Sequence, residues 1–277
     1  MNRTATDIPA PRITSQIILN RRRGKRVIMA AVYLVLLALV VWSVEVTVIE
    51  DTDWERLGGF GKVWEATKKF IGLDLALFPN LIKPAIETLM IACIGTLLGV
   101  IICIPAAWFG ALNITPYKPV TYPLARMMMT LSRSIHEIVW ALFFVSAVGL
   151  GALAGIFAIA VRSVGFIAKM SAEAIEDIDP GPVEAIRAVG GNDFQVVIFA
   201  ILPQVLPQVL GVIIFEWEIN IRRSAILGLV GAGGLGLVFF RQMNTFNFHG
   251  VMSVIVAILG LILIGEALSY WTRRSII

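Results

Sequence analysis

The sequence has few charged residues for its length. Only 15% of its 277 residues are Asp, Glu, Lys or Arg, whereas about 25% is usual in soluble domains. Hydrophobic residues make up 58% of the chain, and the mean hydropathy is +0.84. A soluble protein of this size could not bury so many apolar side chains, so the composition excludes a disordered chain and most soluble enzymes. It indicates an all-α protein that spans a membrane.

Cysteine and histidine are also scarce. Cys93 and Cys103 lie in one apolar segment, and ten residues of helix are about 15 Å long, beyond the reach of a disulfide. We interpret both as packing residues. His136 and His249 lie on different segments, with no Cys/His cluster near either. The sequence therefore predicts no metal site and no cofactor bound by this chain.

The net charge of +4 arises from the N-terminus. The first 26 residues contain seven Lys and Arg residues against one acid, which gives +6 and leaves −2 for the other residues. Such a cluster beside an apolar run is typical of the cytoplasmic side of a membrane helix. No compact basic domain is present, so we expect no nucleic-acid partner. The adjoining run, residues 27–44, is too long for a signal-peptide core and lacks a small-residue cleavage site.

Six segments are long and apolar enough to cross a bilayer, which takes about 20 residues. They are residues 27–49, 84–109, 125–148, 153–174, 205–226 and 250–271. Pro84 would lie in the first turn of the second span. Residues 50–83 would form a periplasmic interfacial segment with a short amphipathic helix around residues 63–71. Residues 1–26 would be a cytoplasmic tail and residues 84–277 a transmembrane domain, with both termini in the cytoplasm.

The segment between the fourth and fifth spans, residues 176–203, carries helix-capping signals. Pro180 and Pro182 would end the fourth helix, and Pro182 also suits the first turn of a new one. That helix would end at the glycine pair 190–191, and Asn or Asp at 192–193 would cap the next helix. The pattern predicts a helix–turn–helix at the membrane surface.

This segment resembles the EAA loop of bacterial ABC importer permeases. The sequence Glu184-Ala185-Ile186, then Gly190, then Leu202-Pro203 has the spacing of that motif. Ile186 stands in place of the second alanine, and Ala200 stands where isoleucine is usual. In that family the short helix is a coupling helix that lies in a groove of the cytoplasmic ATPase. The resemblance implies that the ATPase-coupling residues are Pro182, Glu184, Ala185, Ile186, Gly190 and Pro203.

Three further stretches, residues 133–141, 173–184 and 220–236, resemble the permeases of phosphonate importers. The resemblance implies a type I (MetI-like) ABC importer permease in the bacterial cytoplasmic membrane, which moves phosphonate, phosphite or a related phosphorus oxyanion by alternating access. It also implies a homodimer, two ATP-binding subunits and an external phosphonate-binding protein. The chain lacks the G-x-x-x-x-G-K-[ST] motif, so it is not expected to be an enzyme. ATP and Mg²⁺ would bind to the partner ATPase.

Residues 231–236 satisfy the pattern G-x-G-x-x-G. A dinucleotide-binding fingerprint needs a preceding strand and an acid some 20 residues later. Here the pattern follows a membrane helix, and no such acid is present. We expect these glycines to allow close helix contact or a re-entrant turn that lines the pathway.

Charged residues inside apolar spans are costly and indicate function by default. Arg133 and Glu137 are four residues apart, so a continuous helix would let them pair. Two alternatives stay open for arginines 133, 222 and 223. They attract a phosphonate dianion, or they pair with glutamates 137, 216 and 218 and hold helices together. The candidate translocation path comprises Arg133, His136, Glu137, Glu218, Asn220, Arg222, Arg223, Gly231, Gly233 and Gly234.

Other classes of protein fit these features less well. An ion-coupled secondary transporter would show internal inverted repeats, and none is evident. A membrane-embedded enzyme would need a nucleophile or a metal cluster, and none stands out. Among importers, the alternative substrate is methionine or another small solute.

Overall fold

The computed structural model describes the backbone of residues 15–50 and 59–276 and the side chains of residues 25–50 and 61–275. Over these ranges the chain is helical and contains no strand. It divides into two compact units, residues 1–66 and 67–277. The side chains of most of the predicted basic tail lie outside the described residues.

Within its described residues, the first unit contains a long helix and most of a short one. Helix α1 (Ser15–Val44) continues into the π-helix η1 (Glu45–Glu50), and α3 spans Gly59–Lys68. Residues Lys25–Glu50 are apolar and long enough to cross a membrane. A helix that is apolar on all sides suits a lipid environment. Helix α3 confirms the predicted short helix but begins and ends earlier than residues 63–71.

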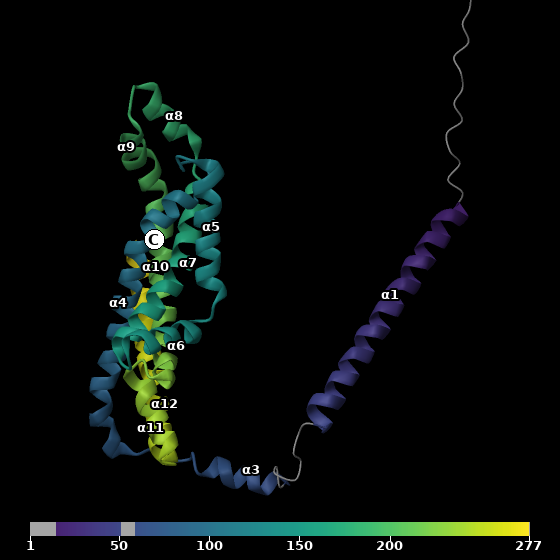
Figure 1. Ribbon diagram of the computed structural model, residues 1–277, viewed down its shortest axis with the longest axis vertical. Coiled ribbons are helices and arrows are strands. Elements are labelled where there is room, and N and C mark those ends of the chain that lie inside the picture. Colours follow the sequence, from purple (N-terminus) through teal and green to yellow (C-terminus); the bar gives the residue numbers. More distant parts are fainter. Residues whose placement is uncertain (1–14, 51–58, 277) are drawn as a thin grey trace, which may run out of the picture. The chain divides into compact units, whose positions relative to one another are not determined.

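The second unit is a bundle of long helices (Figure 1). Its four longest are α4 (Phe78–Gly110), α7 (Ala152–Glu176), α10 (Leu202–Leu227) and α12 (Phe248–Ile276). Helix α7 packs against both α4 and α10, while α12 packs along α10 and the short helix α11 (Gly234–Asn244). Helix α11 is not among the predicted segments.

Small residues bring α4 and α7 together. A Cβ atom at Gly95 would lie 2.8 Å from Cγ2 of Ile159, and one at Gly99 would lie 2.9 Å from Cβ of Ser163. Lipid tails are as apolar as the side chains, so close packing of this kind stabilises helix pairs in a membrane. Ala158 and Ala160 on α7 are likewise buried.

Within the residues that the structure describes, five helices are long and apolar enough to be membrane spans, and a bent pair raises the number to as many as six. The predicted start of the second span at Pro84 is wrong, because α4 begins at Phe78 with a proline already in its first turn. The carboxylate of Asp74 caps the preceding 3₁₀ turn, Leu75–Leu77, by accepting a hydrogen bond from the N–H of Ala76. Pro84 therefore lies inside the helix.

The predicted third span, residues 125–148, is not one helix. It consists of α5 (Lys118–Ser134) and α6 (Glu137–Val148), which meet at 90°. Ile135 and His136 have extended backbone conformations, and Nδ1 of His136 accepts a hydrogen bond from the N–H of Ile138 to start the second helix. No Pro or Gly marks this break, which is why the sequence did not predict it.

Candidate functional site

The segment between α7 and α10 forms the predicted helical hairpin, at one end of the bundle (Figure 1). Helix α8 (Pro180–Ala188) begins at Asp179, whose carboxylate accepts a hydrogen bond from the N–H of Gly181. Gly190 has a φ of +83°, and the next N–H, of Gly191, donates to the carbonyl of Ile186 at 2.9 Å. This is a glycine-dependent helix end, as predicted.

A capping box starts the second arm of the hairpin. The side chain of Asn192 accepts from the N–H of Gln195, whose own side chain accepts from the N–H of Asn192. Helix α9 (Asp193–Val196) then passes through the π-helix η3 (Val197–Ile201) into α10. The predicted cap at residue 192 is confirmed.

The hairpin exposes an apolar tip. Val189 is 83% exposed and Phe194 is 71% exposed. Of the six residues that the EAA resemblance implies, Pro182, Glu184, Ala185, Gly190 and Pro203 are exposed. Ile186 instead packs inward against the buried cluster that contains Val196 and Ile201. The hairpin therefore combines a fixed inner face with an outer face open to a partner.

Hydrogen bonds at its base tie the hairpin to the spans. The N–H of Asp179 donates to Oε1 of Gln204 at 3.0 Å, which joins the start of α8 to α10. Glu176, the last residue of α7, accepts from the N–H of Leu112 and from Nη2 of Arg126 on α5, at 2.8 Å and 2.7 Å. A force on the hairpin would thus reach α5, α7 and α10 through short polar contacts.

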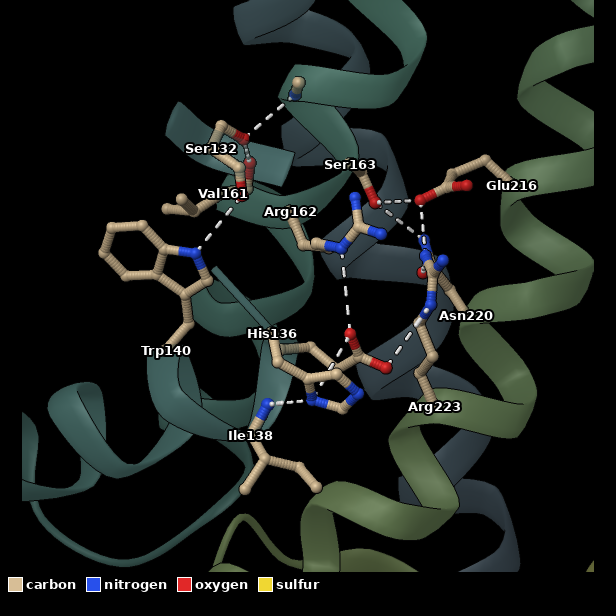
Figure 2. Close-up of polar contacts among 12 residues, drawn as sticks. Ser132, His136, Ile138, Trp140, Val161, Arg162, Ser163, Glu216, Asn220 and Arg223 are labelled. Carbon is tan, nitrogen blue, oxygen red and sulfur yellow. Dashed lines mark hydrogen bonds and ion pairs between the residues drawn. The ribbon is translucent and has the colours of Figure 1, made fainter. Parts of the chain in front are cut away.

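A second group of polar residues lies inside the bundle (Figure 2). Glu216 of α10 is fully buried and lies 2.6 Å from Nη1 of Arg223. The same guanidinium donates to Oδ1 of Asn220, whose Nδ2 donates to Ser163 on α7 and Thr96 on α4, both at 2.8 Å. The network joins three spans through hydrogen bonds.

Glu137 extends this network to α6. Its carboxylate lies 3.6 Å from Nε of Arg223 and 3.7 Å from Nε of Arg162 on α7. The predicted pair between Arg133 and Glu137 is wrong, because the chain turns between α5 and α6. Two glutamates and two arginines, at 137, 162, 216 and 223, thus form a charge-balanced group.

The structure separates the other predicted path residues from this group. Glu218 accepts from Ser269 and from Nη2 of Arg273 on α12, both at 2.7 Å, so it pairs with the last helix. Arg133 and Arg222 are exposed; neither forms an ion pair with a side chain of residues 25–50 or 61–275. The pairing alternative therefore holds for Arg223 alone among the three arginines.

Glycines allow the close approach expected around residue 231. Gly231, Gly233 and Gly234 all have positive φ, and they connect α10 to α11. The carbonyl of Gly231 accepts from the N–H of Gly151, and a Cβ at Gly233 would lie 2.6 Å from Oε1 of Glu87. Residues 231–233 form a tight turn before α11, and this turn packs on α4 and the start of α7.

The site residues predicted from the sequence do not include Arg162, Ser163 or Thr96. An arginine inside an apolar span was the available signal for Arg162. No local signal marks the two hydroxyls, since Ser and Thr are ordinary in membrane helices. No group of three or more His, Cys, Asp or Glu side chains that could hold a metal occurs within the described part of the chain.

Comparison with known proteins agrees with this architecture. The family described as "Binding-protein-dependent transport system inner membrane component" matches residues 103–277. The phosphite transport system permease protein PtxC of Stutzerimonas stutzeri is 38% identical over 73% of this chain and 73% of its own length. The phosphate-import permease protein PhnE of Mycolicibacterium smegmatis is also 38% identical, over 73% of this chain. Only 38% of that longer protein is covered.

A solved structure shares the fold. The MetNI methionine ABC transporter in an inward-facing conformation contains a chain that matches with a TM-score of 0.65 and 24% identity. The match covers 74% of this chain and all of the other one. The protein described here therefore belongs to the family of binding-protein-dependent transport system inner membrane components, the permeases of ABC importers.

Proposed function

We propose that this chain is the membrane-spanning subunit of an ATP-driven importer for phosphorus oxyanions. The observation that carries the substrate class is the 38% identity to permeases named for phosphite and for phosphate. The hairpin at residues 176–203, with its exposed tip and anchored base, supports the assignment to an ATP-driven system. Phosphonate, phosphite and phosphate share the tetrahedral oxyanion that would be recognised.

The energy would come from two separate ATP-binding subunits, which hold the ATP and Mg²⁺. Each ATP-binding subunit would bind the hairpin tip of one of two copies of this chain. When ATP draws these subunits together, α8 would move with them and carry α5, α7 and α10 through its base contacts. Rigid-body motion of this kind exchanges inward-open and outward-open states. An external binding protein would deliver the anion.

An importer of this kind would have one orientation in the membrane. The hairpin, the basic N-terminal tail and the C-terminal Arg273 and Arg274 would lie in the cytoplasm, as the distribution of Lys and Arg favours. The glycine turn at residues 231–234 would then lie toward the periplasm. An inner membrane is the location that the family description names.

Uptake in cells tests the proposal. A bacterial strain without its own phosphorus oxyanion importers would express this chain with its ATPase and binding protein. Radiolabelled phosphite, methylphosphonate, phosphate and methionine would then be supplied separately. We expect ATP-dependent uptake of at least one phosphorus compound and none of methionine, which some weaker relatives are named for. Uptake of methionine alone would assign a different substrate.

A further inference from the structure

Arg162 has hydrogen-bonding capacity that the fold does not use. Its Nε is buried without a hydrogen-bond partner among the described residues, and its side chain is 20% exposed. A guanidinium carries five N–H donors and no acceptor. An unsatisfied donor inside a membrane span costs free energy, so this arginine is poorly explained as a purely structural residue.

The carboxylate of Glu137, the counter-ion of Arg162, lies beyond hydrogen-bond distance of its cationic neighbours. Its oxygens lie 3.6 to 3.8 Å from the nearest nitrogens of Arg223, Arg162 and His136. Charge-assisted hydrogen bonds are shorter, about 2.7–2.9 Å. Glu216, in contrast, lies 2.6 Å from Arg223. Glu137 could therefore leave without breaking a hydrogen bond to its side chain, while Arg223 would keep Glu216.

The position of Glu137 allows such a movement. It is the first residue of α6, directly after the 90° break that follows α5. A rotation of α6 about this break would withdraw the carboxylate and leave the two arginines in place on α7 and α10. The side chains of Glu137, Arg162 and Arg223 are 12%, 20% and 15% exposed, so none of the three is fully buried.

We propose that Arg162 and Arg223 form a subsite for the transported oxyanion, and that Glu137 occupies this subsite as an internal counter-ion when the substrate is absent. Withdrawal of Glu137 would leave two arginines against Glu216, a net charge of +1 that attracts an anion. The planar guanidinium groups match the oxygens of a phosphorus oxyanion, as they match a carboxylate. The substrate class in this inference rests on the proposed function.

Direct binding to the permease tests the subsite. The full-length chain in lipid nanodiscs would be titrated with methylphosphonate, phosphite and inorganic phosphate in a calorimeter. Glu137→Gln keeps the size of the side chain but removes the competing charge, so we expect the apparent Kd to fall about tenfold, about 1.4 kcal/mol. Adding Arg162→Gln to this variant should abolish the gain. Lys169→Gln, which breaks a half-exposed ion pair with Glu173 on the same helix, should bind as the wild type does.

The opposite results would overturn the inference. Binding by Glu137→Gln no tighter than by the wild type, or a gain that survives Arg162→Gln, would show that the arginines are not an anion subsite. If Glu137→Gln does not fold, as judged by its melting curve, Arg162→Lys replaces it. That variant keeps the charge but loses the planar fork, so severalfold weaker binding is expected and unchanged binding contradicts the subsite.

Uptake by wild-type cells separates this inference from the proposed function. If the wild type imports none of the three phosphorus compounds, the proposed function fails. If it imports one of them while Glu137→Gln and Arg162→Gln bind as the wild type does, only the subsite fails.

Discussion

Nη1 of Arg223 lies 2.6 Å from Oε1 of Glu216, and Glu216 has no exposed surface. The two residues are seven apart on α10, so the pair spans two turns of one helix. Asn220 lies between them and accepts from the same guanidinium. A carboxylate buried in this way is stable only while its cation stays in place.

Removing one member of this pair should therefore destabilise the bundle strongly. We expect Arg223→Met to lower the free energy of unfolding by about 3–5 kcal/mol, because it leaves an uncompensated buried charge. The double variant Glu216→Leu with Arg223→Met should lose less than the sum of the single variants. A double-mutant cycle on thermal unfolding in nanodiscs measures the difference, and strict additivity would show that the pair does not interact.

Gly190 should matter for coupling and not for insertion. Its φ of +83° costs a non-glycine residue about 1–2 kcal/mol, but a Cβ there would meet no atom within 4 Å. We expect Gly190→Arg to reach the membrane and to hydrolyse ATP with its partner while uptake falls. The ratio of anion imported to ATP hydrolysed is the measurement. Gly190→Asn, which tolerates positive φ, should be milder; a wild-type ratio in Gly190→Arg would refute the coupling role.

Glu176 should transmit movement from the hairpin. Its carboxylate accepts from Leu112 and Arg126, and Glu176→Gln weakens both contacts without changing size. A hydrogen bond to a charged group contributes about 1.5–3 kcal/mol. We expect severalfold lower uptake per ATP hydrolysed and a small loss of thermal stability. Asp177→Asn, at the neighbouring carboxylate, is the control, and an equal effect of both changes would argue against a specific role.

Two glycine substitutions should have opposite effects on stability. A Cβ at Gly236 would collide with the carbonyl oxygen of Ala225, whereas one at Gly260 would meet nothing within 4 Å. Gly236→Ala should lower the melting temperature markedly, because backbone would have to move. Gly260→Ala lies inside α12 and should stabilise that helix by about 0.5–1 kcal/mol. Equal melting temperatures for the two variants would contradict the close contact of α10 and α11.

The sequence predicted the features that depend on local chemistry. Apolar length located the spans, and the proline, glycine and asparagine signals located the ends of α8 and the cap at residue 192. The break at residues 135–136 was missed because a histidine cap, with no Pro or Gly, starts α6. Helix α11 was not predicted because it begins within the glycine-rich stretch at residues 231–236, and glycines at that density indicate a turn or a close helix contact instead of a helix.

The pairing of charges inside the bundle depends on tertiary contacts, so spacing alone predicted it poorly. The expected Arg133–Glu137 pair assumed a continuous helix. Glu218 and Asn220 are only two positions apart on α10, yet Glu218 accepts hydrogen bonds from α12 whereas Asn220 donates to α4 and α7. Arg162 lies near Glu137 because α6 packs against α7 after the 90° break. No local sequence pattern encodes that break.

Arg222 tests whether an arginine of the predicted translocation path attracts the anion. Replacing it breaks no buried ion pair, so the stability of the bundle should be unaffected. It is exposed on α10, next to the paired Arg223, and forms no ion pair with the side chains that the structure describes. Arg222→Ala should change the free energy of unfolding by less than about 0.5 kcal/mol, as is usual for surface substitutions. If it attracts the anion, uptake should fall severalfold while binding of the anion to the separate binding protein stays normal. Arg274→Ala removes an exposed arginine from the end of α12 and should leave uptake unchanged. Wild-type uptake by Arg222→Ala would exclude this residue from the translocation path, because a charge that guides an anion cannot be removed without slowing its entry.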